Sequence, residues 1–150
     1  MKKPKAIYLD VCALSRPFDD QGYLRIRIET EAVNLILTAT REGFYKLMFS
    51  AVHDEEINAI DDPVERTELL SLLAGLGNRI SEKSRIVRSR AEELAKMGFG
   101  VADAAHVAFA EYVGADFISC DDRLIKQCRN HDIKSWCGNP VGYCEKEGLK

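Results

Sequence analysis

Short apolar runs alternate with helical segments along the chain, and this alternation restricts the possible folds more than any other feature. Strands are predicted at residues 5–9, 45–50, 116–119 and 133–136. The segments between them have helical periodicity, and no hairpin signal joins two neighbouring strands. The pattern therefore predicts an α/β fold in which a parallel sheet of four to five strands is covered by helices on both faces.

Helices are predicted at residues 24–42, 52–60, 63–76, 82–97, 101–113 and 122–129. Asp61 and Asp62 provide an acidic N-cap before Pro63, and Gly98 and Gly114 suit the ends of two later helices. After residue 138 we expect an irregular crossing that ends in one helical turn.

The helix at 24–42 carries two apolar stripes on different faces. One contains Ile28, Ala32, Leu35, Ile36 and Ala39, and the other contains Ile26, Val33 and Leu37. A partner molecule, a second copy of the chain or a loop of the same chain could cover the second stripe.

Length and composition fit one domain over residues 1–150, with 46% hydrophobic and 30% charged residues. The net charge of −3 does not indicate a nucleic-acid binder, but a local basic patch can outweigh a mildly acidic total. The apolar segment at residues 6–9 is too short for a signal peptide or a membrane span. Five cysteines, an odd number without a CxxC pair, indicate reduced thiols in a cytoplasmic protein. We also expect no membrane partner.

Acidic residues gather where the predicted strands end. The helix at 101–113 is apolar nearly all round, yet Asp103 and His106 share one of its faces. Asp10 ends the first strand and Asp121 follows the strand at 116–119. Each acid alone could serve a helix N-terminus, but several together repel one another unless a cation lies between them. Mg²⁺ or Mn²⁺ prefers such oxygen ligands and supports phosphoryl chemistry.

Four segments resemble PIN-domain proteins, the family that includes the VapC-type toxin ribonucleases. They are YLDVCALSRPFDD near the start, SAVHDEEI at 50–57, VADAAHVAFAEYVGADFISCDD at 101–122 and the pair NP at 139–140. The third is the most specific. The resemblance covers almost the whole chain and implies a three-layer α/β/α PIN-like fold, a divalent-metal site and endonucleolytic cleavage of RNA that leaves a 5′-phosphate. It also implies a homodimer and an antitoxin partner.

Carried over by position, the resemblance assigns catalysis and metal binding to four carboxylates, Asp10, Glu56, Asp103 and Asp121. Glu55 remains an alternative to Glu56. Asp122 either supports the site or caps the next helix, and we favour the cap.

Two cysteines depart from the family pattern. Cys12 stands where the family usually has Ser, Thr or Asn, and a thiol is a weaker hydrogen-bonding group. Cys120 replaces a small polar residue beside Asp121, although Ser119 can supply a hydroxyl. Cys12 and Cys120 could form a disulfide or bind a soft metal, but buried inert thiols are the favoured interpretation.

The remaining candidates are two histidines and a group of basic residues. His106 could act as a general base, but a bond to a carboxylate or backbone group is favoured, and His53 is a weaker candidate. Candidates for binding RNA phosphates are Arg16, Arg25, Arg27, Arg123 and Lys126. Intrahelical pairs with Glu29 and Glu31 would explain Arg25 and Arg27 equally well.

The leading hypothesis is a Mg²⁺- or Mn²⁺-dependent endoribonuclease, plausibly the toxin of a toxin–antitoxin pair. Its rival is a catalytically weak or inactive PIN-like module that binds RNA or protein, a hypothesis that rests on Cys12. A phosphatase of the haloacid-dehalogenase type would require Asp-x-Asp where the chain has Asp10-Val11-Cys12. A receiver domain would require paired acids and a late lysine, which cannot be placed.

Overall fold

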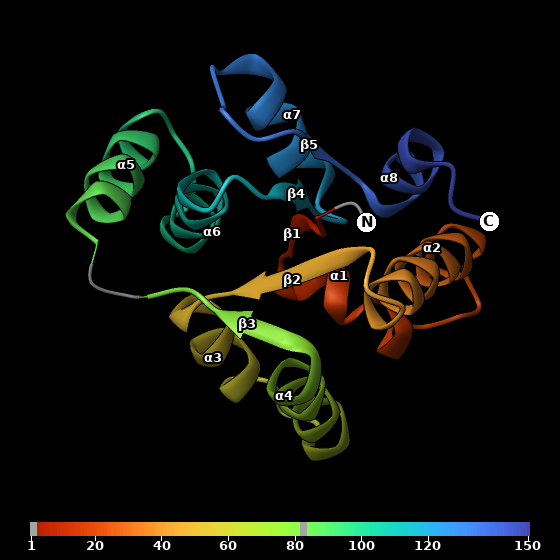
Figure 1. Ribbon diagram of the computed structural model, residues 1–150. Helices are drawn as coiled ribbons and strands as arrows, with labels where there is room; N and C mark the ends of the chain where they lie inside the picture. The colour runs from red at the N-terminus through yellow and green to blue at the C-terminus, as the bar shows by residue number, and fades with distance from the viewer. Residues whose placement is uncertain (1–2, 82–83) are drawn as a thin grey trace.

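The computed structural model describes residues 3–81 and 84–150, and it contains one sheet of five strands. The strands are β1 (Lys5–Leu9), β2 (Tyr45–Phe49), β3 (Gly77–Arg79), β4 (Asp116–Ile118) and β5 (Cys137–Gly138). They lie in the order β3-β2-β1-β4-β5, and every neighbouring pair is parallel (Figure 1). The predicted parallel α/β architecture is confirmed.

Helices cover both faces of this sheet (Figure 1). They are α1 (Val11–Leu14), the short 3-10 helix η1 (Arg16–Phe18), α2 (Leu24–Arg41), α3 (Ala51–Asn58), α4 (Pro63–Leu76), α5 (Arg85–Lys96), α6 (Val101–Tyr112), α7 (Asp122–Asn130) and α8 (Pro140–Glu147). Helices α5 and α6 lie on one side of the sheet, and α2 and α8 lie on the other. Within residues 3–81 and 84–150, no helix has the length and hydrophobicity of a membrane span.

Side chains alternate between the two faces of each strand, so the sheet separates two hydrophobic cores. The core under α2, α4 and α8 receives Ile7, Leu9, Leu47, Phe49 and Ile118. The core under α5, α6 and α7 receives Tyr8, Met48 and Phe117. Asp10 follows Leu9, and this alternation directs it to the same side as Tyr8, which is the side of α6.

Local sequence signals define three of the helix ends as predicted. Asp62 caps α4 by accepting a hydrogen bond from the backbone N of Val64 at 3.0 Å. Gly98 and Gly114 have φ values of 101° and 65°, a left-handed backbone that glycine adopts without strain. Residues 82–83 of the helix predicted at 82–97 lie outside the described residues, and α5 begins after the cap Ser84.

The sheet edges differ from the prediction. Strand β3 was not predicted because its three residues have no apolar pattern; Gly77 is required there, since a Cβ would lie 2.7 Å from a ring carbon of Phe49. The strand predicted at 133–136 is wrong, because the pairing with β4 is made by Cys137 and Gly138.

Two further segments are more helical than predicted. The expected single turn near the C-terminus is the eight-residue helix α8, which Asn139 caps through the backbone N of Gly142 at 2.7 Å. The expected loop after β1 instead begins with α1.

The first turns of α2 also differ from the predicted stripe. Leu24 is 63% exposed and Ile28 is 46% exposed, whereas Glu29 is buried. The apolar stripe that packs on the core begins only at Ala32.

Candidate active site

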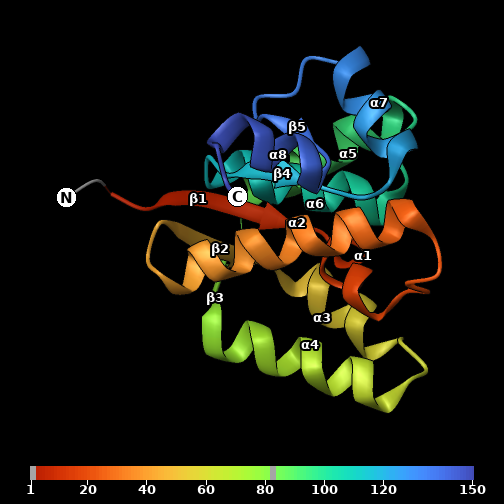
Figure 2. The same ribbon diagram turned by 90° about the vertical axis from the view of Figure 1, so that its right-hand side faces the viewer.

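The point where strand order reverses lies between β1 and β4. From β1 the chain proceeds outward to β2 and β3 on one side, and β4 and β5 extend the sheet on the other. Ligands of open parallel sheets bind beyond the carboxyl ends of the strands at such a point. Figure 2 shows this end of β1 facing α1, the start of α2 and α7.

Asp10 occupies this position directly after β1. Its backbone N donates to the carbonyl of Ile118 at 3.2 Å, so the end of β1 is tied to the end of β4. Its Oδ1 accepts hydrogen bonds from the backbone N of Ala13 and from Cys12 Sγ, both at 3.1 Å. Burial raises the pKa of Asp10, and the bonds from Ser119, Cys12 and Ala13 oppose that shift without cancelling it.

Asp103 faces the other acids from the first turn of α6. Its carboxylate is partly buried and has no hydrogen-bond or ion-pair partner in the described part of the chain. Burial raises its pKa, and the negative charges of Asp10, Asp121 and Glu56 raise it further. The structure therefore places Asp10, Asp121 and Glu56 near enough for their charges to act on Asp103.

A buried polar chain lies behind Glu56. The carboxylate of Glu56 on α3 is bonded to Nε2 of His106 on α6. His106 Nδ1 lies 2.6 Å from the Tyr8 hydroxyl, which lies 2.8 Å from Ser50 Oγ. With Nε2–H donating to Glu56, a neutral ring accepts from Tyr8, and Tyr8 accepts from Ser50. Burial alone would raise the pKa of Glu56, but the hydrogen bond from His106 lowers it.

His53 lies beside this chain, and both of its ring nitrogens bond backbone groups. Its Nε2 donates to the carbonyl of Leu9 at 2.7 Å, and its Nδ1 accepts from the backbone N of Ser50 at 3.1 Å. Burial, together with nearby His106, lowers the pKa of His53 to about 4. Glu55, by contrast, is exposed and has no polar contact within the described residues.

The residues after β4 supply the last carboxylate. Ser119 is fully buried, and its hydroxyl accepts from the backbone N of Asp121 at 3.0 Å. Asp121 caps α7 through the backbone N of Arg123 and of Leu124. The expectation that Asp122 is the cap is therefore wrong, because Asp122 is the first helical residue and its carboxylate pairs with Arg25.

Both cysteines near the site are free thiols. Desolvation by its neighbours and the Asp10 charge raise the pKa of Cys12, and its Sγ lies 3.4 Å from Ser119 Oγ. Burial raises the pKa of Cys120 to about 12. The side chain of Cys12 is exposed and that of Cys120 is buried, so the expectation of buried thiols is wrong for Cys12. Few thiolates form where the pKa is raised, which agrees with the interpretation of both thiols as inert.

The predicted basic residues fall into two groups. Arg16 pairs with Glu29 and Asp19, and Arg25 pairs with Asp122 and Glu29. Arg27 donates to the carbonyl of Gln21 rather than to Glu31. Arg123 and Lys126 are exposed on α7 and have no polar side-chain partner among the described residues.

Three contributors were not identified from the sequence. Tyr8 and Ser50 join the chain behind Glu56, and Glu29 binds two arginines from inside the fold. A tyrosine inside an apolar strand was the available signal for Tyr8, because a buried hydroxyl requires a partner. No comparable signal marks Glu29, whose burial depends on tertiary packing.

The donor set suits a hard cation. Within residues 3–81 and 84–150, no group of three or more His, Cys, Asp or Glu side chains is placed so that it could hold a metal ion. Mg²⁺ does not require one, because it keeps several waters and is commonly held by one or two carboxylates together with substrate phosphates. If such an ion binds, the carboxylate of Asp103, which has no partner among the described residues, and the nearby acids are the groups that would hold it.

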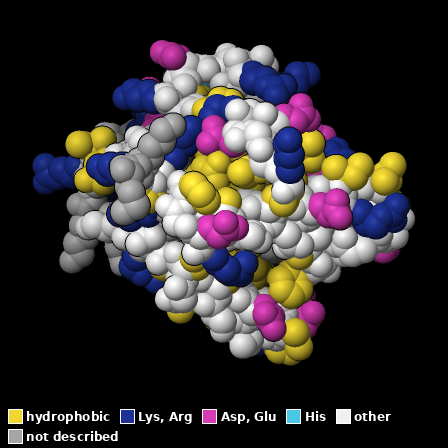
Figure 3. Space-filling model, turned by 45° about the vertical axis from the view of Figure 1, so that its right-hand side comes forward, with side chains coloured by type: hydrophobic (Ala, Val, Ile, Leu, Met, Phe, Trp, Pro, Cys, Tyr) yellow, Lys and Arg dark blue, Asp and Glu magenta, His cyan; other side chains and the backbone are white. Residues whose placement is uncertain are grey.

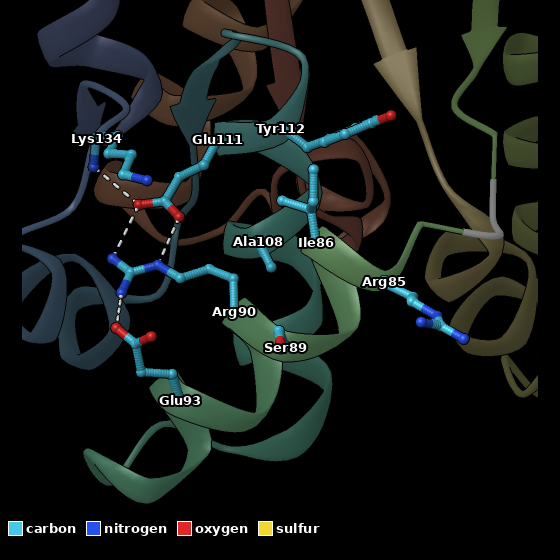
Figure 4. Close-up of a pocket in the computed structure, with 9 residues that line it drawn as sticks. All are labelled: Arg85, Ile86, Ser89, Arg90, Glu93, Ala108, Glu111, Tyr112 and Lys134. Atoms are coloured by element: carbon cyan, nitrogen blue, oxygen red, sulfur yellow. Dashed lines mark hydrogen bonds and ion pairs between the residues drawn. The ribbon is translucent and has the colours of Figure 1, made fainter.

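A different hollow, between α5 and α6, contains none of the predicted site residues (Figure 4). Its volume is about 610 Å³. Inside it Arg90 binds Glu111 and Glu93, and Glu111 also accepts from the backbone N of Lys134. These charged groups pair with one another, so we interpret them as a structural ion-pair cluster that joins α5, α6 and the segment before β5.

Solved structures with a similar fold are known, whereas no protein-family model and no curated protein sequence matches the chain. FitAcB from Neisseria gonorrhoeae is similar with a TM-score of 0.56 and 19% identity, over 89% of this chain and 97% of that one. FitAB bound to an IR36 DNA fragment is similar with a TM-score of 0.57 and 19% identity, over 90% and 95%. These likenesses confirm the predicted PIN-like three-layer fold.

Proposed function

We propose that the protein is a metal-dependent endoribonuclease of the VapC type. The observation that carries this proposal is the half-buried, unpartnered carboxylate of Asp103 facing Asp10, Asp121 and Glu56 at the reversal point of the sheet. Such a group of like charges is stable only with a cation or with retained protons. A cation between acids that come from four separate segments is the arrangement that phosphodiester hydrolysis uses.

Asp10, Glu56, Asp103 and Asp121 are the proposed ligands of Mg²⁺ or Mn²⁺, which would polarise the phosphodiester and lower the pKa of an attacking water. The protein's own groups hold these ligands in place. Ala13 N and Cys12 Sγ orient Asp10, and His106 orients Glu56. His106 is 1% exposed with both ring nitrogens bonded, so it serves to position Glu56 rather than to reach water.

Arg123 and Lys126 are proposed to bind backbone phosphates of the RNA. Both are exposed on α7, the helix that Asp121 caps. Contacts of this kind attract and position the strand without reading its sequence. Figure 3 shows acidic and basic side chains interspersed over one face of the molecule, so such binding would depend on local basic groups rather than on the total charge.

Cleavage of end-labelled RNA by the purified protein tests the proposal. We expect cutting with Mn²⁺ or Mg²⁺, none with EDTA, and a loss of at least about a hundredfold in Asp103→Asn and Glu56→Gln. Glu55→Gln is the matched control, because Glu55 is adjacent and exposed, and this variant should cut like the native protein. Metal-independent cutting, or equal losses in the two Glu variants, would refute the assignment.

A second candidate is a PIN-like module that binds RNA or protein without efficient cleavage. The observation in its favour is Cys12, whose weakly donating thiol contacts Asp10 Oδ1 where a hydroxyl would bind more strongly. The two candidates separate if Mn²⁺ raises the thermal unfolding midpoint, Asp103→Asn removes that rise, and the native protein still cuts no RNA in a broad panel.

We further propose a toxin role in the cytoplasm, with an antitoxin as protein partner and a homodimer as the assembled form. The support is the likeness to FitAB and FitAcB together with the family pattern of the sequence. Co-expression with the product of the adjacent gene tests this: rescue of growth and a stable complex are expected, and growth unaffected by the protein alone would count against it.

A further inference from the structure

A second hollow adjoins the carboxylates at the carboxyl end of the sheet. It has a volume of about 400 Å³ and lies between α2, α7 and the start of α8. Its lining consists of the apolar side chains Leu24, Ile28 and Val141, of Asn139, of Arg25, and of the two acids Glu29 and Asp122. Asp122 directly follows the proposed metal ligand Asp121, so the hollow begins one residue from the proposed metal ligands.

One ion pair lies across the lining of the hollow. Arg25 binds Asp122 through two hydrogen bonds, each 2.7 Å long. The two side chains are 53% and 67% exposed, and an exposed ion pair contributes little net stability. A guanidinium that binds a carboxylate with both nitrogens has the geometry to bind a phosphate in the same way. Arg25 can therefore release Asp122 and bind an RNA phosphate in its place at a small cost in free energy.

Glu29 keeps Arg25 at the hollow independently of Asp122. Its carboxylate is buried and lies 3.4 Å from Arg25, and it also binds Arg16 at 2.9 Å. A buried carboxylate between two arginines restricts their orientations. Arg25 therefore remains directed toward the hollow when its bond to Asp122 opens.

The remaining lining suits a nucleobase. Leu24 and Ile28 are 63% and 46% exposed, although both lie on a helix whose later apolar residues are buried. Apolar contact is non-directional, so it does not distinguish one base from another. Asn139 uses its Oδ1 to cap α8, and its amide nitrogen has no bond among the described residues, which leaves it free to donate.

We propose that this hollow is a nucleotide subsite for single-stranded RNA, in which Arg25 exchanges Asp122 for a backbone phosphate while Leu24, Ile28 and Val141 contact the base. The inference rests on the proposed ribonuclease function and identifies where a nucleotide next to the cleaved bond is held. Asp122 then acts as a competitor for Arg25 that weakens RNA binding.

Fluorescence anisotropy with a labelled single-stranded decanucleotide, in EDTA at low salt, tests the exchange on the full chain without cleavage. We expect Arg25→Ala to weaken binding about tenfold and to reduce the slope of log affinity against log salt by about 0.7. Asp122→Asn should tighten binding about two- to fivefold, since only an exposed ion pair is removed. The double variant should bind like Arg25→Ala, because Asp122 acts only through Arg25.

The exposed pair of Arg88 and Glu92 on α5 provides the matched control. Arg88→Ala and Glu92→Gln should each leave RNA affinity within about twofold, because a single exposed charge away from the hollow has a small effect. Native-like affinity in Arg25→Ala, or no tightening in Asp122→Asn, would overturn the proposal.

The apolar lining needs a test of its own. Leu24→Ala combined with Ile28→Ala should weaken RNA binding while the sedimentation coefficient stays unchanged. If that variant changes from dimer to monomer and binds RNA normally, the hollow is an interface between copies and the proposal fails. RNA binding with all expected changes but no cleavage under any metal would reject the ribonuclease function alone, whereas cleavage without these changes would reject the subsite alone.

Discussion

The imidazole of His106 joins the carboxylate of Glu56 to the hydroxyl of Tyr8, and so connects helix α3 to the central strand β1 through α6. His106 was expected either to act as a base or to bond a carboxylate, and the geometry shows the second arrangement. Since Tyr8 is two residues before Asp10, the same network holds two of the proposed metal ligands in relation to each other.

Removing the Tyr8 hydroxyl tests this network. Tyr8→Phe leaves His106 Nδ1 and Ser50 Oγ without their partner, and we expect a loss of about 1–3 kcal/mol in the free energy of unfolding, measured by urea denaturation. RNA cleavage should fall as well, because Glu56 loses its fixed orientation. Tyr143→Phe is the control: Tyr143 is equally buried, and its hydroxyl donates to Asp116 at 2.8 Å. That variant should lose stability but keep cleavage; if both variants lose cleavage equally, the network only stabilises the fold.

Asp103→Asn should stabilise the metal-free protein. The native carboxylate is partly buried among like charges that raise its pKa, so its ionised form is unfavourable in the folded state above that pKa. We expect the thermal unfolding midpoint at pH 7 in EDTA to rise by a few degrees in the variant. With excess Mn²⁺ the order should reverse, because only the native protein gains stability from the bound ion. Asp61→Asn, at an exposed acid outside the site, should change neither midpoint.

Replacing Cys12 by serine should increase the affinity of the proposed site for Mn²⁺. Cys12 Sγ donates to Asp10 Oδ1 at 3.1 Å, and a hydroxyl is the better donor. A gain of about two- to fivefold in Mn²⁺ affinity is expected, which corresponds to part of one net hydrogen bond, measured by calorimetric titration. Cys137→Ser serves as a control on β5. Unchanged affinity in Cys12→Ser would show that the thiol does not limit the site.

Glu147 predicts a specific loss of stability in acid. Burial alone would raise its pKa, but hydrogen bonds from Lys146, Lys5 and Tyr45 lower the pKa to about 2. The folded-state pKa lies below the unfolded value, so this stabilisation is complete above the unfolded pKa and is lost as the pH falls from about 4.5 toward 2.

We therefore expect Glu147→Gln to lower the free energy of unfolding at pH 7 by about 1–2 kcal/mol, discounted for the partly exposed lysines. The native protein and the variant should converge near pH 2, as measured by urea denaturation at successive pH values. Glu145→Gln, at an exposed residue two positions earlier, should have the same free energy of unfolding as the native protein at pH 7. Its pH dependence should therefore match that of the native protein.

Some features could be predicted because their causes are local. The cap Asp62 with Pro63 and the glycines at 98 and 114 define helix ends through the conformation of a few neighbouring residues. The parallel sheet could be predicted from the alternation of apolar runs and helical segments, because this alternation is also a pattern of neighbouring residues. The edge strands β3 and β5 were missed or misplaced, because three- and two-residue strands have no periodicity and exist only through pairing with β2 and β4.

The sequence by itself determined the longer helices α2 to α7, the parallel arrangement of the sheet and the types of acid at the strand ends. Only the tertiary structure decided how these groups meet: that Asp121 rather than Asp122 caps α7, that His106 bonds Glu56 directly and is linked through Tyr8 to Ser50, and that Glu29 is buried beneath Arg25. Backbone propensity and period depend on adjacent residues, whereas burial and side-chain pairing depend on segments that packing brings together from distant parts of the chain.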